Sequence, residues 1–532
     1  MSFTSLYFMV FVFAVCVFYY LVPGKYQWVL LLFASYGFYA AQGLTCIVFL
    51  LAVTLTVYLS ALSIGWQQEK ADREGEKMLE EGASLEERKI YKAKKKKAAK
   101  YIVIVCLFVN LGILAVLKYL NFGIDNLNRI FSWIGYGKQV TYVDLLLPLG
   151  ISFYMFQSLG YLLDVYWKRA KVQKNFFKYA LFVSFFPQLG QGPISRYGAL
   201  SKTLYGVHSL DGRKIFFGLE RILWGVFKKL VIADRIGAAV QSLVSEPAYY
   251  RGVFVLVEML FYAVQLYCDF TGGIDITIGT AQLFGIEVAE NFLRPFFSKS
   301  IKEYWRRWHI TMGTWFKDYV FYPFSISKPL RNLTSFVKRH FGISVAKRVS
   351  VYTATIVLWI ATGIWHGAYW RFVMWGLMNG VIILVSEELE PLYGRFHKKF
   401  PALVKSTGYR AFMVIRTFLL MSSLRLFDNA RGCRDAFISF RSIFTQWDLK
   451  ALTVKELTDL GLAKADYLIV AVGVLLLVLV SLLQRKQPVR EYLAKKPFMI
   501  QYLIVAGLFF SILLFGVYGV GYDSSGFIYN QF

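Results

Sequence analysis

Long apolar runs separated by short polar stretches extend through the whole chain. Clear examples occupy residues 8–22, 45–62, 101–117, 467–483 and 498–519. Each is close to the length of about 20 residues at which a helix crosses a bilayer. No basic segment precedes the first run and no small-residue cleavage site follows it before the next span, so we expect it to be retained. The pattern predicts an all-α polytopic membrane protein with roughly a dozen crossings.

The middle of the chain is less regular than its ends. Residues 145–167 contain Pro148, and residues 182–200 are broken by Pro187 and Pro193. Because non-helical backbone at membrane depth persists only where protein or a cavity surrounds it, this region favours one helical body around an internal site. The expected divisions are N-terminal transmembrane helices (1–64), a charged cytoplasmic loop (65–100), a core (101–430), C-terminal transmembrane helices (431–519) and a tail (520–532).

The charge of the polar stretches indicates which side of the membrane each end faces. Residues 65–100 are the most polar stretch and contain consecutive lysines at 94–97, so we expect them in the cytoplasm. Three spans precede this stretch, which places the N-terminus outside. The basic stretch 484–496 precedes the final span, which places the C-terminus outside as well. We therefore expect a multi-pass protein of the cell membrane with both ends extracytoplasmic.

Composition agrees with this class and weakens one alternative. Hydrophobic residues make up 57% of the chain and charged residues 17%, and the formal net charge is +27. A nucleic-acid-binding surface is one source of such a charge, but the basic residues lie mostly in short loops between apolar runs, as the positive-inside bias predicts. We therefore expect a lipid bilayer and no nucleic acid as partner. The five cysteines are scattered without metal-ligand spacing, so they are expected to pack and no metal site is predicted.

Two of the five histidines lie in apolar or aromatic surroundings. His309 follows the string Trp-Arg-Arg-Trp, and His366 follows some fifteen largely apolar residues. Ionisable groups at membrane depth are costly and by default indicate function. One interpretation is a neutral core histidine bonded to a backbone carbonyl. The other is a general base, because a desolvated imidazole stays neutral and can take a proton from a hydroxyl.

The segment around His309 combines aromatic and basic side chains. Trp305, Arg306, Arg307 and Lys317 either belong to a helix at the membrane interface or line the mouth of a funnel that attracts a phosphate-bearing donor. Spacing alone does not separate the two interpretations. The glycines of residues 269–285 lack the pattern of a phosphate-binding loop and are expected to allow close helix packing.

Residues 267–323, followed by Gly-Ile-Trp-His-Gly-Ala-Tyr-Trp at 363–370, resemble the membrane-bound O-acyltransferases. The branch resembled is the bacterial one that acetylates alginate and peptidoglycan and is related to the teichoic-acid D-alanylation subunit. The resemblance implies a ring of tilted transmembrane helices around a central tunnel. It also implies that His366 is the catalytic histidine and His309 the second conserved one. No bound cofactor is implied. The resemblance does imply a co-substrate, an acyl thioester carried by coenzyme A (acyl-CoA) or by an acyl carrier protein.

The last residues of the sequence read Gly-Phe-Ile-Tyr-Asn-Gln-Phe. The resemblance implies that Tyr529 of such a tail accepts the acyl group, while Phe527 and Phe532 anchor it. It further implies an extracytoplasmic partner similar to SGNH hydrolases, which completes transfer to a polymer. The alternative for these aromatics is an interfacial belt.

The functional hypothesis is a membrane-bound O-acyltransferase. It moves an acyl group, acetyl first among the candidates, from a cytoplasmic thioester through the membrane to Tyr529 and then to the partner, for O-acylation of a cell-surface polysaccharide. A D-alanyl transferase of the teichoic acid type is one alternative. A transporter or flippase is another, because broken spans with buried polar groups also occur in that class.

Overall fold

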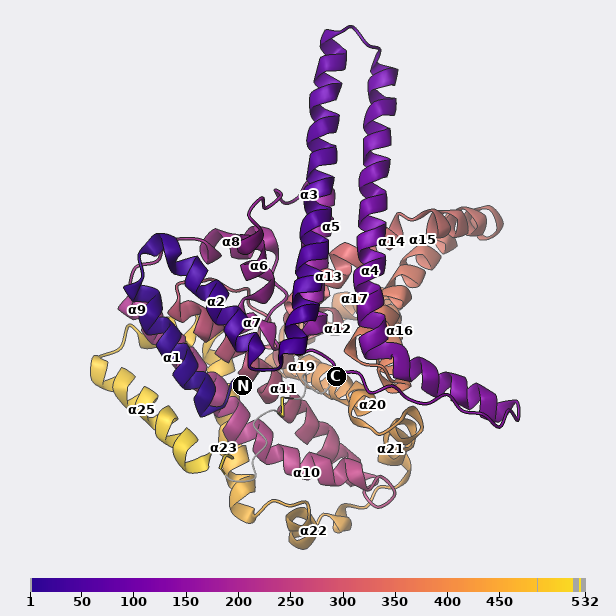
Figure 1. Ribbon diagram of the computed structural model, residues 1–532. Coiled ribbons are helices and arrows are strands. Elements are labelled where there is room, and N and C mark those ends of the chain that lie inside the picture. The colour runs from indigo at the N-terminus through magenta and orange to yellow at the C-terminus, as the bar shows by residue number, and fades with distance from the viewer. Residues whose placement is uncertain (1, 486, 520–525, 528–532) are drawn as a thin grey trace. The chain divides into compact units, whose positions relative to one another are not determined.

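The computed structural model describes residues 2–485, 487–519 and 526–527, and these contain helices and no strand (Figure 1). The chain divides into two compact units. Unit 1 comprises Met1–Ile215 and Thr280–Val288, and unit 2 comprises Phe216–Gly279 and Ala289–Phe532. The helical content and the membrane-spanning helices confirm the prediction of an all-α polytopic membrane protein.

Unit 1 is built from the first eight α-helices. Their bounds are α1 Leu6–Leu21, α2 Gln27–Ala40, α3 Leu44–Glu80, α4 Leu85–Trp133, α5 Ile151–Tyr166, α6 Phe176–Ser184, α7 Phe186–Leu189 and α8 Tyr197–Leu204, with a 3₁₀ turn at Gly24–Tyr26. The core of this unit is aromatic: the ring of Tyr161 in α5 lies 4.9 Å from Tyr179 in α6 and 4.8 Å from Tyr197 in α8. The proline-broken stretch 182–200 lies in and between the short helices α6, α7 and α8 and is largely buried.

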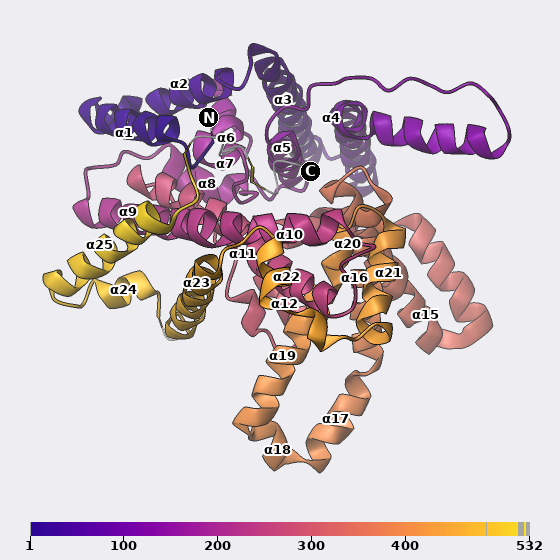
Figure 2. The ribbon, with the colours of Figure 1, turned by 90° about the horizontal axis from the view of Figure 1, so that it is seen from below.

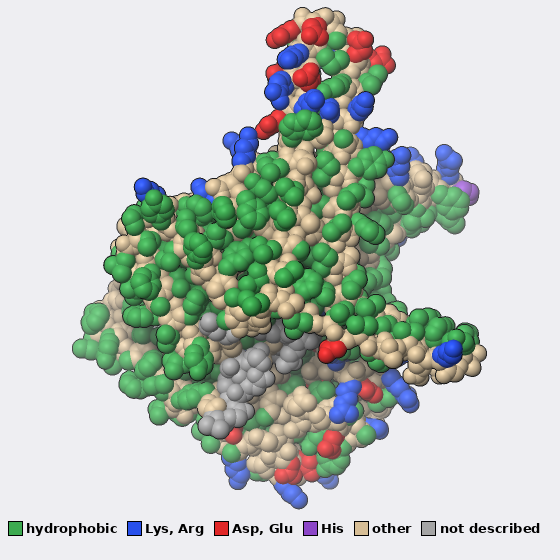
Figure 3. Space-filling model, in the orientation of Figure 1, with side chains coloured by type: hydrophobic (Ala, Val, Ile, Leu, Met, Phe, Trp, Pro, Cys, Tyr) green, Lys and Arg blue, Asp and Glu red, His purple; other side chains and the backbone are tan. Residues whose placement is uncertain are grey.

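The charged stretch 65–100 forms a helical hairpin. It consists of the end of α3 and the start of α4, which stand side by side (Figure 1). A capping box starts α4, in which the Ser84 hydroxyl accepts from Glu87 N–H and the Glu87 carboxylate accepts from Ser84 N–H. Charged side chains gather at the tip of the hairpin, above a largely apolar surface (Figure 3). Each of the two helices thus has an apolar, membrane-spanning part and continues beyond it into a charged part.

Unit 2 holds the remaining helices. Their bounds are α9 Gly212–Val226, α10 Asp234–Ser245, α11 Val253–Leu283, α12 Ile301–Arg307, α13 Ile310–Phe316, α14 Tyr322–Ser325, α15 Lys328–His366, α16 Trp370–Glu388, α17 Glu390–Lys399, α18 Pro401–Lys405, α19 Thr407–Leu424, α20 Leu426–Asn429, α21 Cys433–Thr445, α22 Val454–Asp459, α23 Lys464–Leu483, α24 Val489–Leu493 and α25 Phe498–Phe515. The first residues of α9 and the last of α11 fall in unit 1. Two π-helical segments, η2 (Phe227–Ala233) and η4 (Lys317–Phe321), continue α9 and α13, and 3₁₀ turns occur at Pro295–Phe297 and Leu449–Ala451.

Glycines let α9 and α11 approach at backbone distance. A side-chain carbon on Gly272 of α11 would lie 2.9 Å from the carbonyl oxygen of Gly225 in α9, which leaves no room for one. This contact confirms the prediction that the glycines of residues 269–285 serve close helix packing. Helices α23 and α25 then pack against η2, the continuation of α9 (Figure 2).

Six helices in the described ranges are long and apolar enough to cross a membrane, or seven if the bent pair α16 and α17 is one span. They are α3, α4, α11, α15, α23 and α25, and α1 is a shorter apolar helix. The number is smaller than the roughly dozen crossings expected from apolar runs. Part of the difference lies at the N-terminal end, where α1 and α2 are shorter than 18 residues, and the rest in the middle of the chain, where the runs form short helices separated by breaks.

Candidate active site

His366 is the last residue of α15, at the point where this membrane-spanning helix ends. Only 6% of the residue is exposed. Its imidazole lies edge-on to the ring of Trp375 in α16, with ring centroids 4.8 Å apart, and to the ring of Trp365, at 5.0 Å. The imidazole is therefore held in an aromatic enclosure formed by two successive helices.

A direct contact between two helix backbones brings Trp375 to His366. A side-chain carbon on Gly363 would lie 2.3 Å from the carbonyl oxygen of Phe372, and one on Gly376 would lie 2.3 Å from that of Trp359. Since only glycine fits at either position, α15 and α16 cross at the distance that small residues permit.

His309 occupies the turn between α12 and α13 and is fully buried, with 0% exposed. Its backbone is left-handed, with φ 48° and ψ 53°, a conformation that costs a residue with a side chain about 1–3 kcal/mol. The neighbouring segment secures the turn, because the N–H of Ile310 donates to the carbonyl of Asn291 over 3.0 Å. The surrounding structure, and not local preference, thus determines where His309 points.

Asn291 also indicates which nitrogen of His309 carries the proton. Its Oδ1 accepts from the backbone N–H and the hydroxyl of Thr311, both at 3.0 Å, which identifies that atom as the amide oxygen. The same oxygen lies 3.3 Å from Nδ1 of His309, so Nδ1 is the donor. The lone pair of the neutral ring is then on Nε2.

The electrostatic surroundings of His309 favour that neutral ring. Burial is the larger cause and the positive charge of Arg425 the smaller, and together they lower the pKa of His309 to about 3. At neutral pH the imidazole is therefore uncharged, the form that can accept a proton or a hydrogen bond.

Trp365 joins the two histidines. Its ring centroid lies 6.0 Å from that of His309 and 5.0 Å from that of His366. The structure thus brings the two histidines that the sequence singled out next to one indole. The other three, His208, His340 and His397, lie at half-buried or exposed positions.

Arg425 and Asp428 form a buried ion pair beside this cluster, with Nη1 and Oδ2 2.7 Å apart. The Arg425 guanidinium lies 4.7 Å from the ring centroid of Trp308 and 5.3 Å from that of Trp375. It therefore connects the turn of His309 with the helix that encloses His366. Sequence reasoning missed Arg425, Asp428 and Asn291. A signal was available for the first two, because an arginine and an aspartate three residues apart follow the apolar run of α19.

The four residues predicted to bind a donor divide into two pairs. Trp305 points inward, with its ring 4.6 Å from Trp359, and the guanidinium of Arg307 pairs with Glu303. Arg306 and Lys317 are exposed. Inward packing of Trp305 is not the position of an interfacial tryptophan, whereas the two exposed cations are accessible to a ligand.

Two residues of the tail, Gly526 and Phe527, are described, while Tyr529 and Phe532 lie outside the described residues. Phe527 is 1% exposed, and the ammonium of Lys229 lies 4.5 Å from its ring centroid. The same ammonium donates to the carbonyl of Gly526 over 2.8 Å. The start of the tail motif is thus inserted into unit 2.

Lys229 is a buried cation, 1% exposed, with three acceptors. Besides Gly526, its Nζ contacts Oδ1 of Asp269 at 2.6 Å and Oδ1 of Asp234 at 2.7 Å. An ammonium group has three N–H donors, so the two carboxylates and the tail carbonyl use all of them. Burial alone lowers the pKa of Lys229, but the two aspartates outweigh it and hold that pKa above the usual value.

A cavity of about 960 Å³ lies elsewhere in unit 2, and neither histidine lines it. A tunnel that reaches His366 therefore stays a prediction. Within the described part of the chain, no group of three or more His, Cys, Asp or Glu side chains is placed to hold a metal ion.

Comparisons with known proteins place this arrangement in a family. The profile of the membrane-bound O-acyltransferase family matches residues 169–425, which include both histidines and end at Arg425. The chain is 31% identical to the probable alginate O-acetylase AlgI of Azotobacter vinelandii over 461 residues, 85% of this chain and 81% of the relative. It is 30% identical to the peptidoglycan O-acetyltransferase of Helicobacter pylori, over 57% of this chain and 58% of that protein. It is 26% identical to the teichoic acid D-alanyltransferase of Bacillus subtilis, over 52% and 67% respectively.

The match to the alginate O-acetylase extends over most of both chains. The other two relatives are also named as transferases, one for peptidoglycan and one for teichoic acid. They confirm the resemblance noted around His309 and His366. The chain is an O-acyltransferase and belongs to the membrane-bound O-acyltransferase family.

Proposed function

We propose that this enzyme transfers an acetyl group from a cytoplasmic thioester to Tyr529 and from there to an extracytoplasmic, SGNH-hydrolase-like partner, for O-acetylation of a cell-surface polysaccharide. The observation that carries the proposal is the pair of buried histidines on one tryptophan, in a chain similar to O-acetylases of two envelope polymers. Acetyl-CoA and an acetylated carrier protein are the two donor types.

The burial of the two histidines supports different roles for them. His309 is fully enclosed and its Nδ1 is occupied by Asn291, so it positions its neighbours and the thioester. His366 retains a small exposed area at the end of α15 and is the general base. The proton it removes is that of the acceptor hydroxyl.

The chemistry of the first step balances without a cofactor. The phenol oxygen of Tyr529 attacks the thioester carbonyl, His366 takes the phenol proton, and the C–S bond breaks with release of the thiolate. The thiol has an ordinary pKa of about 8.5 and the phenol of about 10, so the thiol is the better leaving group. The tyrosyl ester is in turn more activated than a sugar ester, which makes the second transfer downhill.

The contacts of Lys229 with Gly526 and Phe527, which we call the seat of the tail, support Tyr529 as the relay residue. Lys229 holds Gly526 and Phe527, and its partner Asp269 is followed directly by Phe270, whose ring lies 4.8 Å from that of His309. Two residues of chain span at most about 7 Å, so anchoring Phe527 restricts the reach of Tyr529. The residues that hold the tail and His309 are thus joined by one short segment of α11.

The exposed cations Arg306 and Lys317 are proposed to bind the donor. Both lie on the segment that carries His309, and phosphate groups of coenzyme A or of a carrier-protein arm match their charge. The basic hairpin at 65–100 is proposed to face the cytoplasm, with both chain ends outside.

The test uses purified protein in proteoliposomes with isotope-labelled acetyl-CoA or acetylated carrier protein, followed by mass spectrometry of the C-terminal peptide. The proposal predicts a labelled acetyl group on Tyr529, absent from the Tyr529→Phe protein. Labelling only by a D-alanyl carrier would favour the activity named for the Bacillus subtilis relative. Solute movement without consumption of thioester would favour a transporter or flippase.

A further inference from the structure

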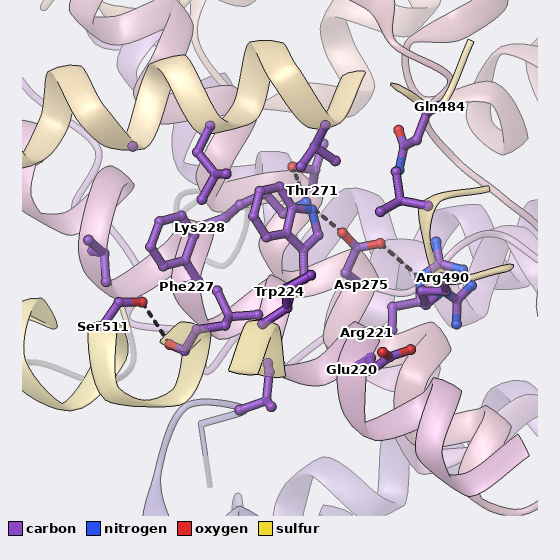
Figure 4. A pocket seen from close by; sticks show the side chains of 18 of the residues that line it. Glu220, Arg221, Trp224, Phe227, Lys228, Thr271, Asp275, Gln484, Arg490 and Ser511 are labelled. Atoms are coloured by element: carbon purple, nitrogen blue, oxygen red, sulfur yellow. Dashed lines mark hydrogen bonds and ion pairs between the residues drawn. The ribbon is translucent and has the colours of Figure 1, made fainter. Parts of the chain in front are cut away.

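The cavity of about 960 Å³ lies between α9 with η2, α11 and the C-terminal helices α23 to α25 (Figure 4). This volume is at the upper end of the range found for small-molecule sites. Neither His309 nor His366 lines it, but Phe292 does, and the ring of Phe292 lies 6.4 Å from that of His309. The side chains that line the cavity indicate which ligand it suits.

One half of the cavity is apolar and membrane-spanning. Leu468, Val472 and Leu476 line it from one face of α23, and Ile504 and Leu508 line it from α25. Both helices are long and apolar enough to cross a bilayer. The lining residues of α23 run from Ala465 to Gln484, about 28 Å of helix at 1.5 Å per residue. That length suits an extended acyl chain.

The other half of the cavity is polar and lies where the two spans end. Gln484 and Arg490 belong to the connection that follows α23 and precedes α25, which is the level of the lipid headgroups. Glu220 of α9 reaches the same end (Figure 4). A molecule with its chain between the spans would place its head at these side chains.

Most of the charges in this half are compensated within the protein. Arg221 forms two hydrogen bonds of 2.6 Å with Glu290 and one of 2.9 Å with Asp275, and Lys228 donates to Asp275 over 2.6 Å and to the Thr271 hydroxyl over 2.7 Å. This network stabilises the wall of the cavity and needs no ligand.

Glu220 differs from that network. It is 7% exposed, and its buried Oε2 has no hydrogen-bond partner among the described residues. Burial raises the pKa of Glu220 to about 7, and the positive charge of Arg490 opposes this only in part. A buried carboxyl oxygen without a donor is costly, so a ligand that brings a donor would be stabilised here.

We propose that this cavity binds a phospholipid with an ethanolamine head, its ammonium donating to Glu220, its phosphate at Arg490 and an acyl chain between α23 and α25. The paired opposite charges of the head match the paired opposite charges of the two side chains. A choline head has no N–H to donate, and a glycerol head carries no cation for the carboxylate. The site does not depend on the acyl-transfer proposal.

The experiment is native mass spectrometry of the full-length protein released from nanodiscs of phosphatidylethanolamine, phosphatidylcholine or phosphatidylglycerol. One phosphatidylethanolamine is expected to remain bound, with at least about tenfold lower retention of the other two lipids. Glu220→Gln, which removes the charge, is expected to abolish this preference. Leu476→Trp, which fills the apolar half, is expected to remove the lipid, whereas Val478→Trp, at an exposed position of the same helix that does not line the cavity, retains it.

Three outcomes would overturn the proposal. The first is equal retention of the three lipids by the unaltered protein, as for lipid bound without head recognition. The second is equal retention by the Leu476→Trp and Val478→Trp proteins, which would place the lipid elsewhere. The third is a co-purified mass that corresponds to an acyl thioester, which would make the cavity a donor site.

Discussion

Phe527→Ala is expected to disable the tail while leaving the fold intact. The ring is 1% exposed and lies 4.5 Å from the ammonium of Lys229. Complete burial of a phenylalanine side chain contributes about 1.5–3 kcal/mol, and a desolvated cation–π contact about 2 kcal/mol. Loss of both weakens the seat by about 4 kcal/mol, or nearly three powers of ten at 1.4 kcal/mol for each tenfold change. Lys229 keeps Asp269 and Asp234, so no buried charge loses its partner.

The assay is the initial rate of acetyl labelling of Tyr529 in proteoliposomes. Phe527→Ala is expected to lower this rate by about a hundredfold or more. Phe527→Leu keeps most of the apolar area and loses the cation–π contact of about 2 kcal/mol, so about a thirtyfold decrease is expected. Phe444→Ala, at a ring that is exposed in the same unit, serves as the matched control. A wild-type rate in the Phe527→Ala protein would refute the reasoning that this seat positions the relay tyrosine.

Three further predictions concern other parts of unit 2. Because burial, with a smaller effect of Arg425, lowers the pKa of His309 to about 3, the unfolded chain binds a proton that the folded chain does not as pH falls from about 6.5. The free energy of unfolding should therefore fall between pH 6.5 and 3, by up to about 1.4 kcal/mol per pH unit, and thermal melts of His309→Gln in detergent should lack this component. Gly363→Ala should cost about 1–3 kcal/mol of stability, because the new carbon meets a carbonyl of α16, while Gly394→Ala, with nothing within 4 Å, should be neutral; equal melting temperatures would contradict the close helix crossing. Arg306→Gln with Lys317→Gln should raise KM for acetyl-CoA at unchanged kcat, and an unaltered KM at low salt would remove these cations from the donor site.

The membrane-spanning helices could be predicted because their signal is local. The runs at 45–62 and 467–483 lie within α3 and α23. An apolar stretch of that length is by itself enough to predict a membrane-spanning helix. The helices of the stretch 65–100 also have local signals. Its charges are spaced as in a helix, and Ser84 and Glu87 form a capping box, a local signal for the start of a helix. The polar stretch therefore forms a hairpin of two extended helices.

The geometry of the site could not be predicted in the same way. His309 and His366 are about 57 residues apart in sequence, and nothing in that spacing shows that both rings lie against Trp365. Their proximity depends on a left-handed turn at His309 and on the crossing of α15 and α16. Both are determined by tertiary contacts.

The roles of Asn291 and Lys229 could not be predicted from the sequence either. Asn291 acts through one amide oxygen that contacts three partners on another segment, and no local pattern marks it. Lys229 follows Lys228, and two adjacent lysines are typical of an exposed helix surface. Lys229 is nevertheless buried between two aspartates and the tail carbonyl. Partners distant in the chain give each residue its role.

The most direct test of the account is whether His366 is needed for acetyl to reach Tyr529. Wild-type, His366→Ala and, as a control, His340→Ala proteins are placed in proteoliposomes with labelled acetyl donor, and the C-terminal peptide is weighed by mass spectrometry. His340 is exposed, so its removal should leave the label unchanged. The account predicts a labelled Tyr529 in the wild-type and His340→Ala proteins and none in a folded His366→Ala protein. Labelling of Tyr529 at the wild-type rate in His366→Ala would contradict it.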